Sequence, residues 1–374
     1  MRNNIVNVNP SICTIIAKNY IAFARTLCSS FLEHHPNGKC YVLIIDGIDG
    51  YIDASEENFE IIRIEELNIP RLTEFCYKYN LTELATAFKP YLIDYLFKSK
   101  GMDSILYLDP DILVTHPLDD LYEELKKADI ILTPHLDKDY PDDGLMPDDG
   151  HIMRSGIFNL GFIGLRKSDS TGEFLSWWKH KLYDKCVIDT PAGYFVDQKF
   201  IDLASVLFPN ITIIKDTGYN AAYWNTHSRR IYKKENKWMC NNGILYFYHF
   251  SNYKPEKPNI LSGHQTRYRL EELEGLNALF IMYTNLLKQN GYDSTRQLPY
   301  DYNQYTNGRI ISDAERIAYR KGLPITAVDN PFVWETHSFK VKMPKEKRNI
   351  KTLRRYPKNK IKAPFKSLWR KLRS

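Results

Sequence analysis

Short apolar runs alternate with segments of helical spacing over the first 260 residues of the chain. Buried strands are predicted at 12–17, 40–46, 59–64, 104–108, 128–134 and 156–165, and in the runs ITIIK (211–215) and ILYFYHF (244–250). Helices are predicted between them at 19–35, 80–98, 170–185 and 196–207, and Pro90 is expected to interrupt the second of these. Strands that alternate with helices indicate an α/β fold with a largely parallel sheet.

The pattern changes after residue 262. Segment 263–335 is predicted to be helical, with Ser312 as the N-cap of one helix. The remaining residues are rich in lysine and arginine. We therefore predict three parts: an α/β domain at 1–262, a helical C-terminal part at 263–335 and a basic tail at 336–374.

The composition is that of an ordinary globular protein, with 43% hydrophobic and 26% charged residues. No apolar run approaches the roughly 18 residues that a membrane helix needs. The N-terminal segment lacks the apolar stretch of a signal peptide, so none is expected. The six cysteines are scattered, several of them within apolar runs, and form no CxxC pair. We expect free buried thiols and a cytoplasmic protein.

The basic charge is concentrated at the C-terminal end. Residues 340–374 contain 15 Lys or Arg and one acid, a net charge of +14, which leaves −8 for the rest of a chain whose net charge is +6. Overall basicity is therefore no argument for nucleic acid, and no such partner is expected. Four apolar side chains of the tail share one helical face, which suits an anionic membrane surface: Phe365, Leu368, Trp369 and Leu372. A solvated tail and an RNA-contacting arm are the alternatives.

Two aspartates, Asp109 and Asp111, follow the apolar strand 104–108 with only Pro110 between them. Carboxylates this close repel each other, and a divalent cation relieves the repulsion. In a largely parallel sheet, ligands bind outside the carboxyl ends of the strands, where this pair and His249 are expected to lie. On these residues alone a turn, an aspartyl phosphatase motif and a metal-bridged diphosphate site all stay open. The phosphatase pattern has Thr or Val where this chain has Leu113.

Five motifs occur in an order that resembles one enzyme family. They are IIAKNYIAFARTLCSSFLEHHP, LTELATAFKPYLIDYLF with ILYLDPDILV, FNLGFIGL, VDQKFID and YHFSNYKP. Over about residues 10–260 they resemble retaining glycosyltransferases of the GT-A fold, near the glycogenin and bacterial lipopolysaccharide galactosyltransferase group (family 8). GYNAAYWN, HQTRYR and NGRIISDAERIAYR further resemble bacterial cell-surface polysaccharide transferases with a helical C-terminal part. The resemblance implies a GT-A nucleotide-diphospho-sugar transferase domain with a mixed, mostly parallel sheet.

The resemblance also implies a metal site made by Asp109, Asp111 and His249. An imidazole beside two carboxylates suits Mn²⁺ better than Mg²⁺. A strand-end histidine that is hydrogen-bonded in the core is the alternative for His249.

The resemblance implies a nucleotide contact at Asp109 and nucleoside contacts at three residues after the first strand: Ala17, Asn19 and Tyr20. In the loop expected to cover the diphosphate it implies contacts at Ser251 and Lys254. Lys257 is a rival to Lys254. UDP is the expected nucleotide, although Ala17 departs from the family pattern: relatives that bind uracil often have an acidic residue at this position.

The resemblance implies sugar contacts for Lys89, for Asn159 and for the pair Asp197 and Gln198, which matches residues under the anomeric carbon. The pair is therefore the expected catalytic pair. A solvated helix lysine is the alternative for Lys89. Helix N-terminal capping is the alternative for the pair Asp197 and Gln198, and it is compatible with the sugar-binding role. The polar segment 135–155 is predicted to be a long loop that binds the acceptor, with Asp149, His151 and Arg154 as candidates. A solvated loop with no role is the alternative.

We therefore expect a metal-dependent glycosyltransferase of the hexosyltransferase class. It would move a sugar from a nucleotide sugar to a cell-surface glycan or lipid-linked acceptor, with retained anomeric configuration, as a peripheral protein at the inner membrane face. A DxD phosphohydrolase and a non-catalytic nucleotide-sugar-binding protein at the membrane are the alternatives.

Overall fold

The structure is a computed structural model that describes residues 10–322 and 330–334. The predicted basic tail, 336–374, lies outside the described residues. The division of the chain at residue 262 stays a prediction.

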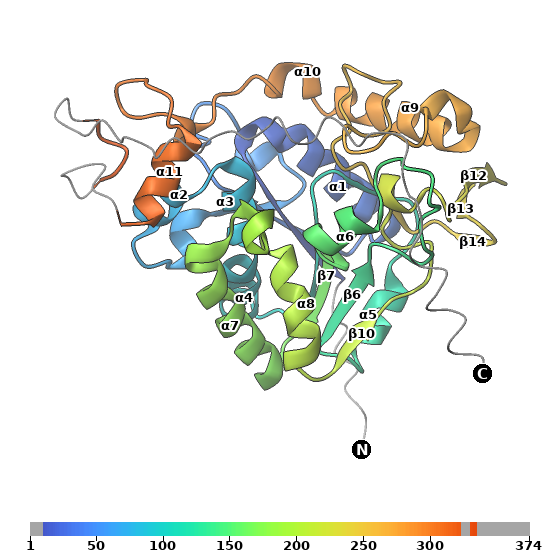
Figure 1. Cartoon of the computed structure of the whole chain (residues 1–374), viewed down its shortest axis with the longest axis horizontal. Coiled ribbons are helices and arrows are strands. Elements are labelled where there is room, and N and C mark those ends of the chain that lie inside the picture. The colour runs from blue at the N-terminus through green and yellow to red at the C-terminus, as the bar shows by residue number, and fades with distance from the viewer. Residues whose placement is uncertain (1–9, 323–329, 335–374) are drawn as a thin grey trace, which may run out of the picture. The chain divides into compact units, whose positions relative to one another are not determined.

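A seven-stranded sheet forms the centre of the fold (Figure 1). Its strand order is β10 (Ile211–Ile213), β6 (Ile130–Pro134), β7 (Phe158–Arg166), β4 (Ser104–Leu108), β1 (Ser11–Ile16), β2 (Lys39–Ile44) and β3 (Glu60–Arg63). Neighbouring strands are parallel except around β7, which is antiparallel to both β4 and β6. The predicted α/β class with a mixed, mostly parallel sheet is confirmed.

The reversed direction of β7 decides where its first residues lie. The start of β7 lies at the carboxyl ends of its neighbours, because Pro134, the last residue of β6, pairs with Phe158, and Leu108, the last residue of β4, pairs with Phe162. The backbone N–H of Asp109 then donates to the Gly161 carbonyl at 2.8 Å. Asn159 therefore lies at the same edge of the sheet as the aspartate pair.

Helices cover both faces of the sheet (Figure 1). Alternate residues of β1 belong to two separate apolar cores, Ile12 and Ile16 to one and Cys13 and Ile15 to the other. The first core is closed by α1 (Ile21–His34) and α5 (Asp119–Leu125). The second is closed by α2 (Leu72–Lys78), α3 (Leu81–Ala87), α4 (Lys89–Ser99), α7 (Asp169–Lys185) and α8 (Gln198–Leu207).

The predicted interruption of helix 80–98 is confirmed. The segment forms α3 and α4, which meet at Phe88, and Pro90 lies in the first turn of α4. Proline is tolerated in a first helical turn because the N–H that it lacks would have no intrahelical partner there.

A second, three-stranded sheet was not predicted as such. It consists of β11 (Ala221–Ala222), β15 (Phe247–His249) and β5 (Ile112–Val114), and β15 is antiparallel to β5. The pattern did not predict β12 (Ile231–Lys234) and β13 (Lys237–Cys240), or β8 (Ile188–Asp189) and β9 (Tyr194–Phe195). The predicted strand 244–250 is divided between β14 (Gly243–Ile244) and β15. These strands are too short to show a periodicity of their own.

The C-terminal part contains α9 (Glu274–Gln289), α10 (Tyr292–Thr295) and α11 (Asp313–Arg320). Both α9 and α10 pack against α1. Ser312 is the N-cap of α11, as predicted, and its hydroxyl accepts from the Glu315 N–H.

Segment 135–155 is not the uninterrupted loop that was expected, because Asp149–Ser155 forms helix α6. The Asp148 side chain caps this helix by accepting from the His151 N–H, so the run of Asp residues is partly a capping signal.

All six cysteines are buried and free, as predicted. No helix among residues 10–322 and 330–334 combines the length and the apolar character needed to cross a membrane.

Candidate functional site

Asp109, Asp111 and His249 lie together at the carboxyl end of β4. Each offers one ligand atom, and these atoms lie within 4.8 Å of one another. His249 Nε2 is 3.0 Å from Asp111 Oδ1 and 3.8 Å from Asp109 Oδ2. The Tyr107 hydroxyl donates to the other oxygen of Asp109 at 2.8 Å, which fixes that carboxylate. The structure thus brings the three residues of the predicted metal site together.

The register of the small sheet carries His249 to the aspartates. His249 pairs with Ile112, the residue after Asp111, and the Phe250 N–H donates to the Asp111 carbonyl at 2.8 Å. The imidazole then packs against the edge of Trp224, with ring centroids 5.2 Å apart. A Cβ at Gly161 would lie 2.3 Å from His249 Cε1, so only glycine leaves room for the ring.

The three side chains suit a hard or borderline divalent ion. Burial lowers the pKa of His249, but the Asp111 and Asp109 carboxylates outweigh that effect and the net pKa is raised. The carboxylates therefore attract a cation at this point, and a metal ion would take the place of the proton. Two carboxylate oxygens with one imidazole nitrogen form a donor set that fits Mn²⁺.

A cavity of about 220 Å³ opens beside the aspartates. One side consists of residues at the end of β1, among them Ala17 and the half-exposed Tyr20, and another of residues from α3. Tyr107, Asp109, Pro110 and Asp111 complete the lining. The predicted nucleoside contacts Ala17 and Tyr20 and the metal-binding aspartates therefore border one cavity.

Lys89 is buried and is not the solvated helix lysine that was the alternative. Its Nζ lies 2.6 Å from Asp197 Oδ2, and both side chains are at most 2% exposed. It also donates to the Leu160 carbonyl at 2.7 Å and lies over the Tyr107 ring, 4.3 Å from its centroid. Because Tyr107 bonds Asp109, the Lys89–Asp197 pair and the aspartate pair belong to one connected site.

Asp197 is the N-cap residue of α8, but its side chain makes no capping hydrogen bond. Its buried carboxylate is paired with Lys89 instead. Burial raises the pKa of Asp197, whereas Lys89 lowers it, and the net pKa is raised. The carboxylate therefore has its charge partner on α4, although Asp197 occupies the N-cap position of α8.

Gln198 and Asn159 are hydrogen-bonded to each other. Gln198 Oε1 accepts from the Leu160 N–H at 3.0 Å and from Asn159 Nδ2 at 3.4 Å. His135 and Asn220 join them, at 3.3 Å and 3.0 Å from the Asn159 amide. We call Asn159, Gln198, His135 and Asn220 the amide network.

The other predicted residues are placed as follows. Ser251 is half-buried and Lys254 and Lys257 are exposed, all on the loop that follows β15. Asp149 and Arg154 are exposed on α6, and His151 Nδ1 lies 2.5 Å from Asp148 Oδ1, within the N-terminal cap of that helix. Asn19 lies in the single helical turn Lys18–Tyr20 after β1. The roles predicted for these residues stay predictions.

Several residues of the site were missed. Tyr107 could have been found, because residues two apart on a strand face the same side and Asp109 follows it by two. GYNAAYWN was used only for its resemblance, although Asn220 and Trp224 come from it. Gly161 lies in the motif FNLGFIGL and His135 begins segment 135–155, but neither residue was assigned a role of its own.

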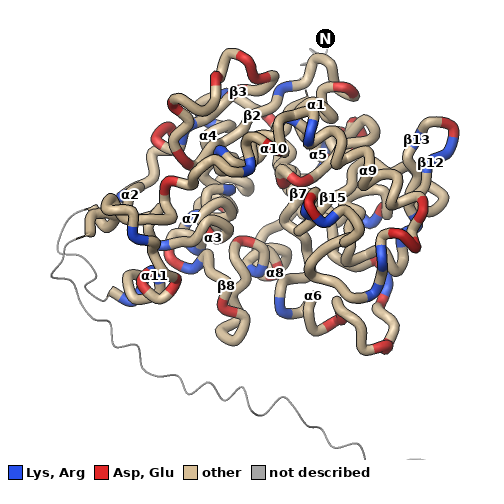
Figure 2. The backbone as a smooth tube through the Cα atoms, turned by 90° about the horizontal axis from the view of Figure 1, so that it is seen from above, with Lys and Arg blue, Asp and Glu red and all other residues tan. Residues whose placement is uncertain are grey.

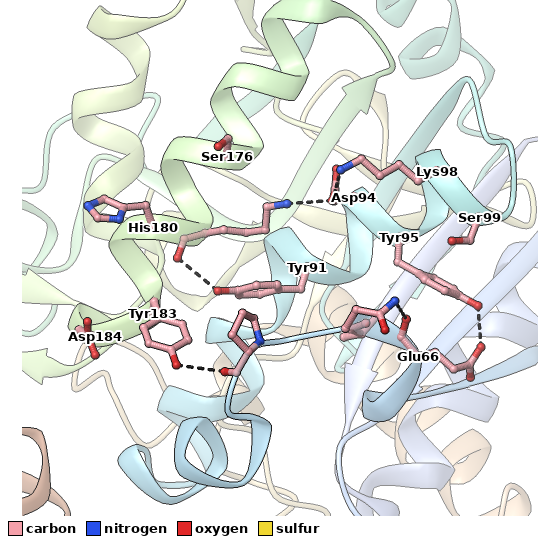
Figure 3. A pocket seen from close by; sticks show the side chains of 14 residues that line it. Glu66, Tyr91, Asp94, Tyr95, Lys98, Ser99, Ser176, His180, Tyr183 and Asp184 are labelled. Carbon is pink, nitrogen blue, oxygen red and sulfur yellow. Dashed lines mark hydrogen bonds and ion pairs between the residues drawn. The ribbon is translucent and has the colours of Figure 1, made fainter.

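Another cavity lies between α4 and α7 (Figure 3). It measures about 550 Å³, and charged groups in it pair with one another: Asp94 accepts from Lys98 and Lys179, both at 2.8 Å. The Tyr183 ring has Lys78 Nζ over it at 3.8 Å. Because these groups already satisfy each other, we place the site at the strand ends.

No protein-family model matches the chain. Two curated proteins of Bacillus subtilis (strain 168) are similar to it. The uncharacterized protein YfnF is 24% identical over 260 residues, which cover 65% of this chain and 81% of YfnF. The uncharacterized protein YfnD is 23% identical over 283 residues, which cover 74% of this chain and 88% of YfnD.

Among solved structures, the chain is similar to the glycosyltransferase GlyE of Streptococcus pneumoniae TIGR4, at 17% identity and a TM-score of 0.44, covering 80% of this chain and 67% of GlyE. It is also similar to the galactosyltransferase LgtC in complex with donor and acceptor sugar analogs, at 16% identity and a TM-score of 0.45, covering 75% and 95%. These likenesses are distant, so we base the function on the chain's own residues.

Proposed function

We propose that the protein is a metal-dependent glycosyltransferase of the GT-A type that uses a nucleotide sugar as donor. The observation that carries the proposal is the group Asp109, Asp111 and His249 at the rim of a cavity bordered by Ala17 and Tyr20. Two carboxylates and an imidazole would hold a divalent ion there, and that ion would supply positive charge to stabilise a nucleoside diphosphate as the leaving group. The similarity to solved glycosyltransferases agrees with this proposal.

The chain's own residues would divide the work around the sugar. Asp109 and Asp111 would hold Mn²⁺ or Mg²⁺ together with His249, and Ala17, Asn19 and Tyr20 would contact the nucleoside, with UDP as the proposed nucleotide. Ser251 and Lys254 would cover the diphosphate. Asp197, kept in place by Lys89, would put a negative charge near the positive anomeric centre of the transition state.

We propose transfer with retained anomeric configuration, of a hexosyl unit. The buried carboxylate of Asp197 is paired with Lys89 at 2.6 Å, which weakens it as a covalent nucleophile and suits a charge-stabilising role. Analysis of the product by NMR checks the configuration. An inverted anomer would require Asp197 to act as a general base instead.

For the acceptor we propose a cell-surface glycan precursor or a lipid-linked glycan at the inner face of the cytoplasmic membrane, with segment 135–155 as the acceptor side. The basic charge that would bind anionic lipid is in the tail. Over the described residues Lys and Arg are interspersed with Asp and Glu (Figure 2).

The test is Mn²⁺-dependent release of free nucleotide from a panel of UDP-, GDP- and CDP-sugars. We expect release from one donor, its loss on chelation of the metal and its loss in Asp111→Asn. Asp103→Asn is the matched control, because Asp103 is an exposed aspartate just before β4, at the opposite end of the same strand.

Two results would contradict the proposal. Hydrolysis of a phosphomonoester with no release from any nucleotide sugar would identify a phosphohydrolase. Metal-dependent binding of a nucleotide sugar without release or transfer, in the presence of membrane glycolipid acceptors, would identify a non-catalytic binding protein.

A further inference from the structure

The amide network has one possible direction of hydrogen bonding, because backbone groups fix it at several points. The Leu160 N–H can only donate, so the atom of Gln198 that faces it at 3.0 Å is the carbonyl oxygen. The Ser155 carbonyl can only accept, so the atom of Gln198 at 3.0 Å from it is the amide nitrogen. The orientation of the Gln198 amide is therefore set by two backbone groups.

The orientation of Asn159 is set in the same way. The Gly161 N–H donates to its Oδ1 at 3.1 Å, and Asn220 Nδ2 donates to the same oxygen at 3.0 Å. Asn159 Nδ2 must then be the atom that faces Gln198 Oε1 at 3.4 Å and His135 Nε2 at 3.3 Å. Because Nδ2 is a donor, His135 Nε2 has to be the unprotonated, accepting nitrogen.

The environment of His135 favours a neutral ring. The side chain is buried, and its ring packs edge-on against Trp224 with centroids 5.2 Å apart. Burial lowers the pKa of His135 to about 4, so the ring is neutral near pH 7. A neutral imidazole has one accepting nitrogen, and here it faces Asn159.

The amides of Asn159 and Gln198 differ in how many of their hydrogen-bonding positions are already used. A side-chain amide has two N–H donors and two acceptor lone pairs, and Asn159 uses all four within the protein. Gln198 uses both lone pairs of Oε1, on Leu160 and Asn159, but Nε2 has one N–H left after the bond to Ser155. A sugar can gain a hydrogen bond from Gln198 without breaking one, but not from Asn159.

We propose that Asn159 is a positioning residue whose amide is fixed by His135, and that Gln198 meets the donor sugar with an N–H and not with its carbonyl oxygen. The inference rests on the proposed function and sharpens the roles at its sugar site. The Gln198 carbonyl, with both lone pairs engaged, is not available to attack or contact the anomeric carbon. Asp197 is then the residue of the pair that carries negative charge toward that carbon.

The first test needs no substrate and therefore stands apart from the proposed function. Long-range ¹H–¹⁵N correlation spectra of the full chain with ¹⁵N-labelled histidine report the tautomer of each ring, and His135→Gln assigns the His135 signals. We expect a neutral His135 with the proton on Nδ1 at pH 7. Asn159→Asp puts an oxygen where the Nδ2 donor lay, and His135 Nε2 should become protonated. A proton on Nε2 in the native protein, or no change in Asn159→Asp, would overturn the proposal.

The second test is kinetic and uses the nucleotide sugar that the panel above identifies. His135→Leu removes the acceptor and should lower kcat about 10- to 100-fold, the effect of a misplaced catalytic group, with KM for the donor within about threefold. His135→Gln, whose Oε1 can accept near the position of Nε2, should recover most of kcat. Unchanged kcat in His135→Leu, or a rise in KM alone in Asn159→Asp, would instead make Asn159 a direct sugar contact.

Discussion

At the scale of single residues, the site depends on charges that are buried only because each has a partner. Lys89 and Asp197 are the clearest pair, since both are nearly inaccessible and their charged atoms are 2.6 Å apart. Ions in a protein interior lose their hydration, and the loss is tolerable only while both partners are present.

Lys89→Met keeps much of the size of the side chain and leaves the Asp197 charge buried without its partner. We expect the free energy of unfolding to fall by about 3–5 kcal/mol, measured by urea denaturation at pH 7. The double variant Lys89→Met with Asp197→Asn removes both charges and should be more stable than the single one. Equal stability of the single and double variants would show that the pair is not coupled.

Gly161 is the second residue on which the site depends. Gly161→Ala would place a methyl group against His249 and the Asn159 side chain. Because the imidazole has to move, we expect affinity for Mn²⁺, measured by titration calorimetry, to fall about 10- to 100-fold. Gly172→Ala is the control: it lies in α7 with nothing within 4 Å of the new methyl group, and should keep the affinity and gain up to about 1 kcal/mol of stability.

At the scale of elements, α11 has a complete capping box. The Ser312 hydroxyl accepts from the Glu315 N–H at 3.3 Å, and Glu315 Oε2 accepts from the Ser312 N–H at 2.9 Å. Burial raises the pKa of Glu315, but its hydrogen bonds to Ser312 and Arg309 lower the pKa by more than burial raises it. The net pKa therefore lies below its ordinary value of 4.5. The folded state therefore favours the ionised carboxylate.

The stabilisation by Glu315 is consequently complete above pH 4.5 and is lost as the pH falls through its lower folded-state pKa. Ser312→Ala should lower the free energy of unfolding by about 1 kcal/mol at pH 7. Between pH 5 and pH 3 the free energy of unfolding should fall less for Glu315→Gln than for the native chain, measured by urea denaturation at each pH. Parallel pH profiles for native protein and Glu315→Gln would rule out this linkage.

At the scale of the whole molecule, segments that are far apart in the sequence meet beside the end of β1. Lys18, next to the proposed nucleoside contact Ala17, is buried between Asp46 at 3.2 Å and Asp301 at 2.5 Å. Asp301 belongs to the C-terminal part, and its other oxygen accepts from the Gly47 N–H at 2.8 Å. The C-terminal part thus supports the strand ends that border the cavity.

The tail gives a prediction at the same scale. Flotation with vesicles that contain anionic lipid should recover the full chain, and deletion of 340–374 should abolish recovery, because that segment carries a net charge of +14. Replacing Phe365, Leu368, Trp369 and Leu372 by serine keeps the charge and tests the apolar face separately. Equal recovery of the deleted and full chains would place membrane binding elsewhere or nowhere.

The sequence by itself determined the order and type of the longer elements, the break at Pro90, the Ser312 cap and the position of Asp109 and Asp111 directly after a buried strand. These features are local, because periodicity, capping and proline chemistry act over one or two turns. The tertiary structure alone decided that β7 runs backwards, that β5 and β15 pair in a register that brings His249 to Asp111, and that Lys89 meets Asp197. Strand direction, register and burial depend on contacts between segments that are far apart in the sequence. Strands β5 and β15, for example, are more than 130 residues apart, and no local pattern encodes their pairing.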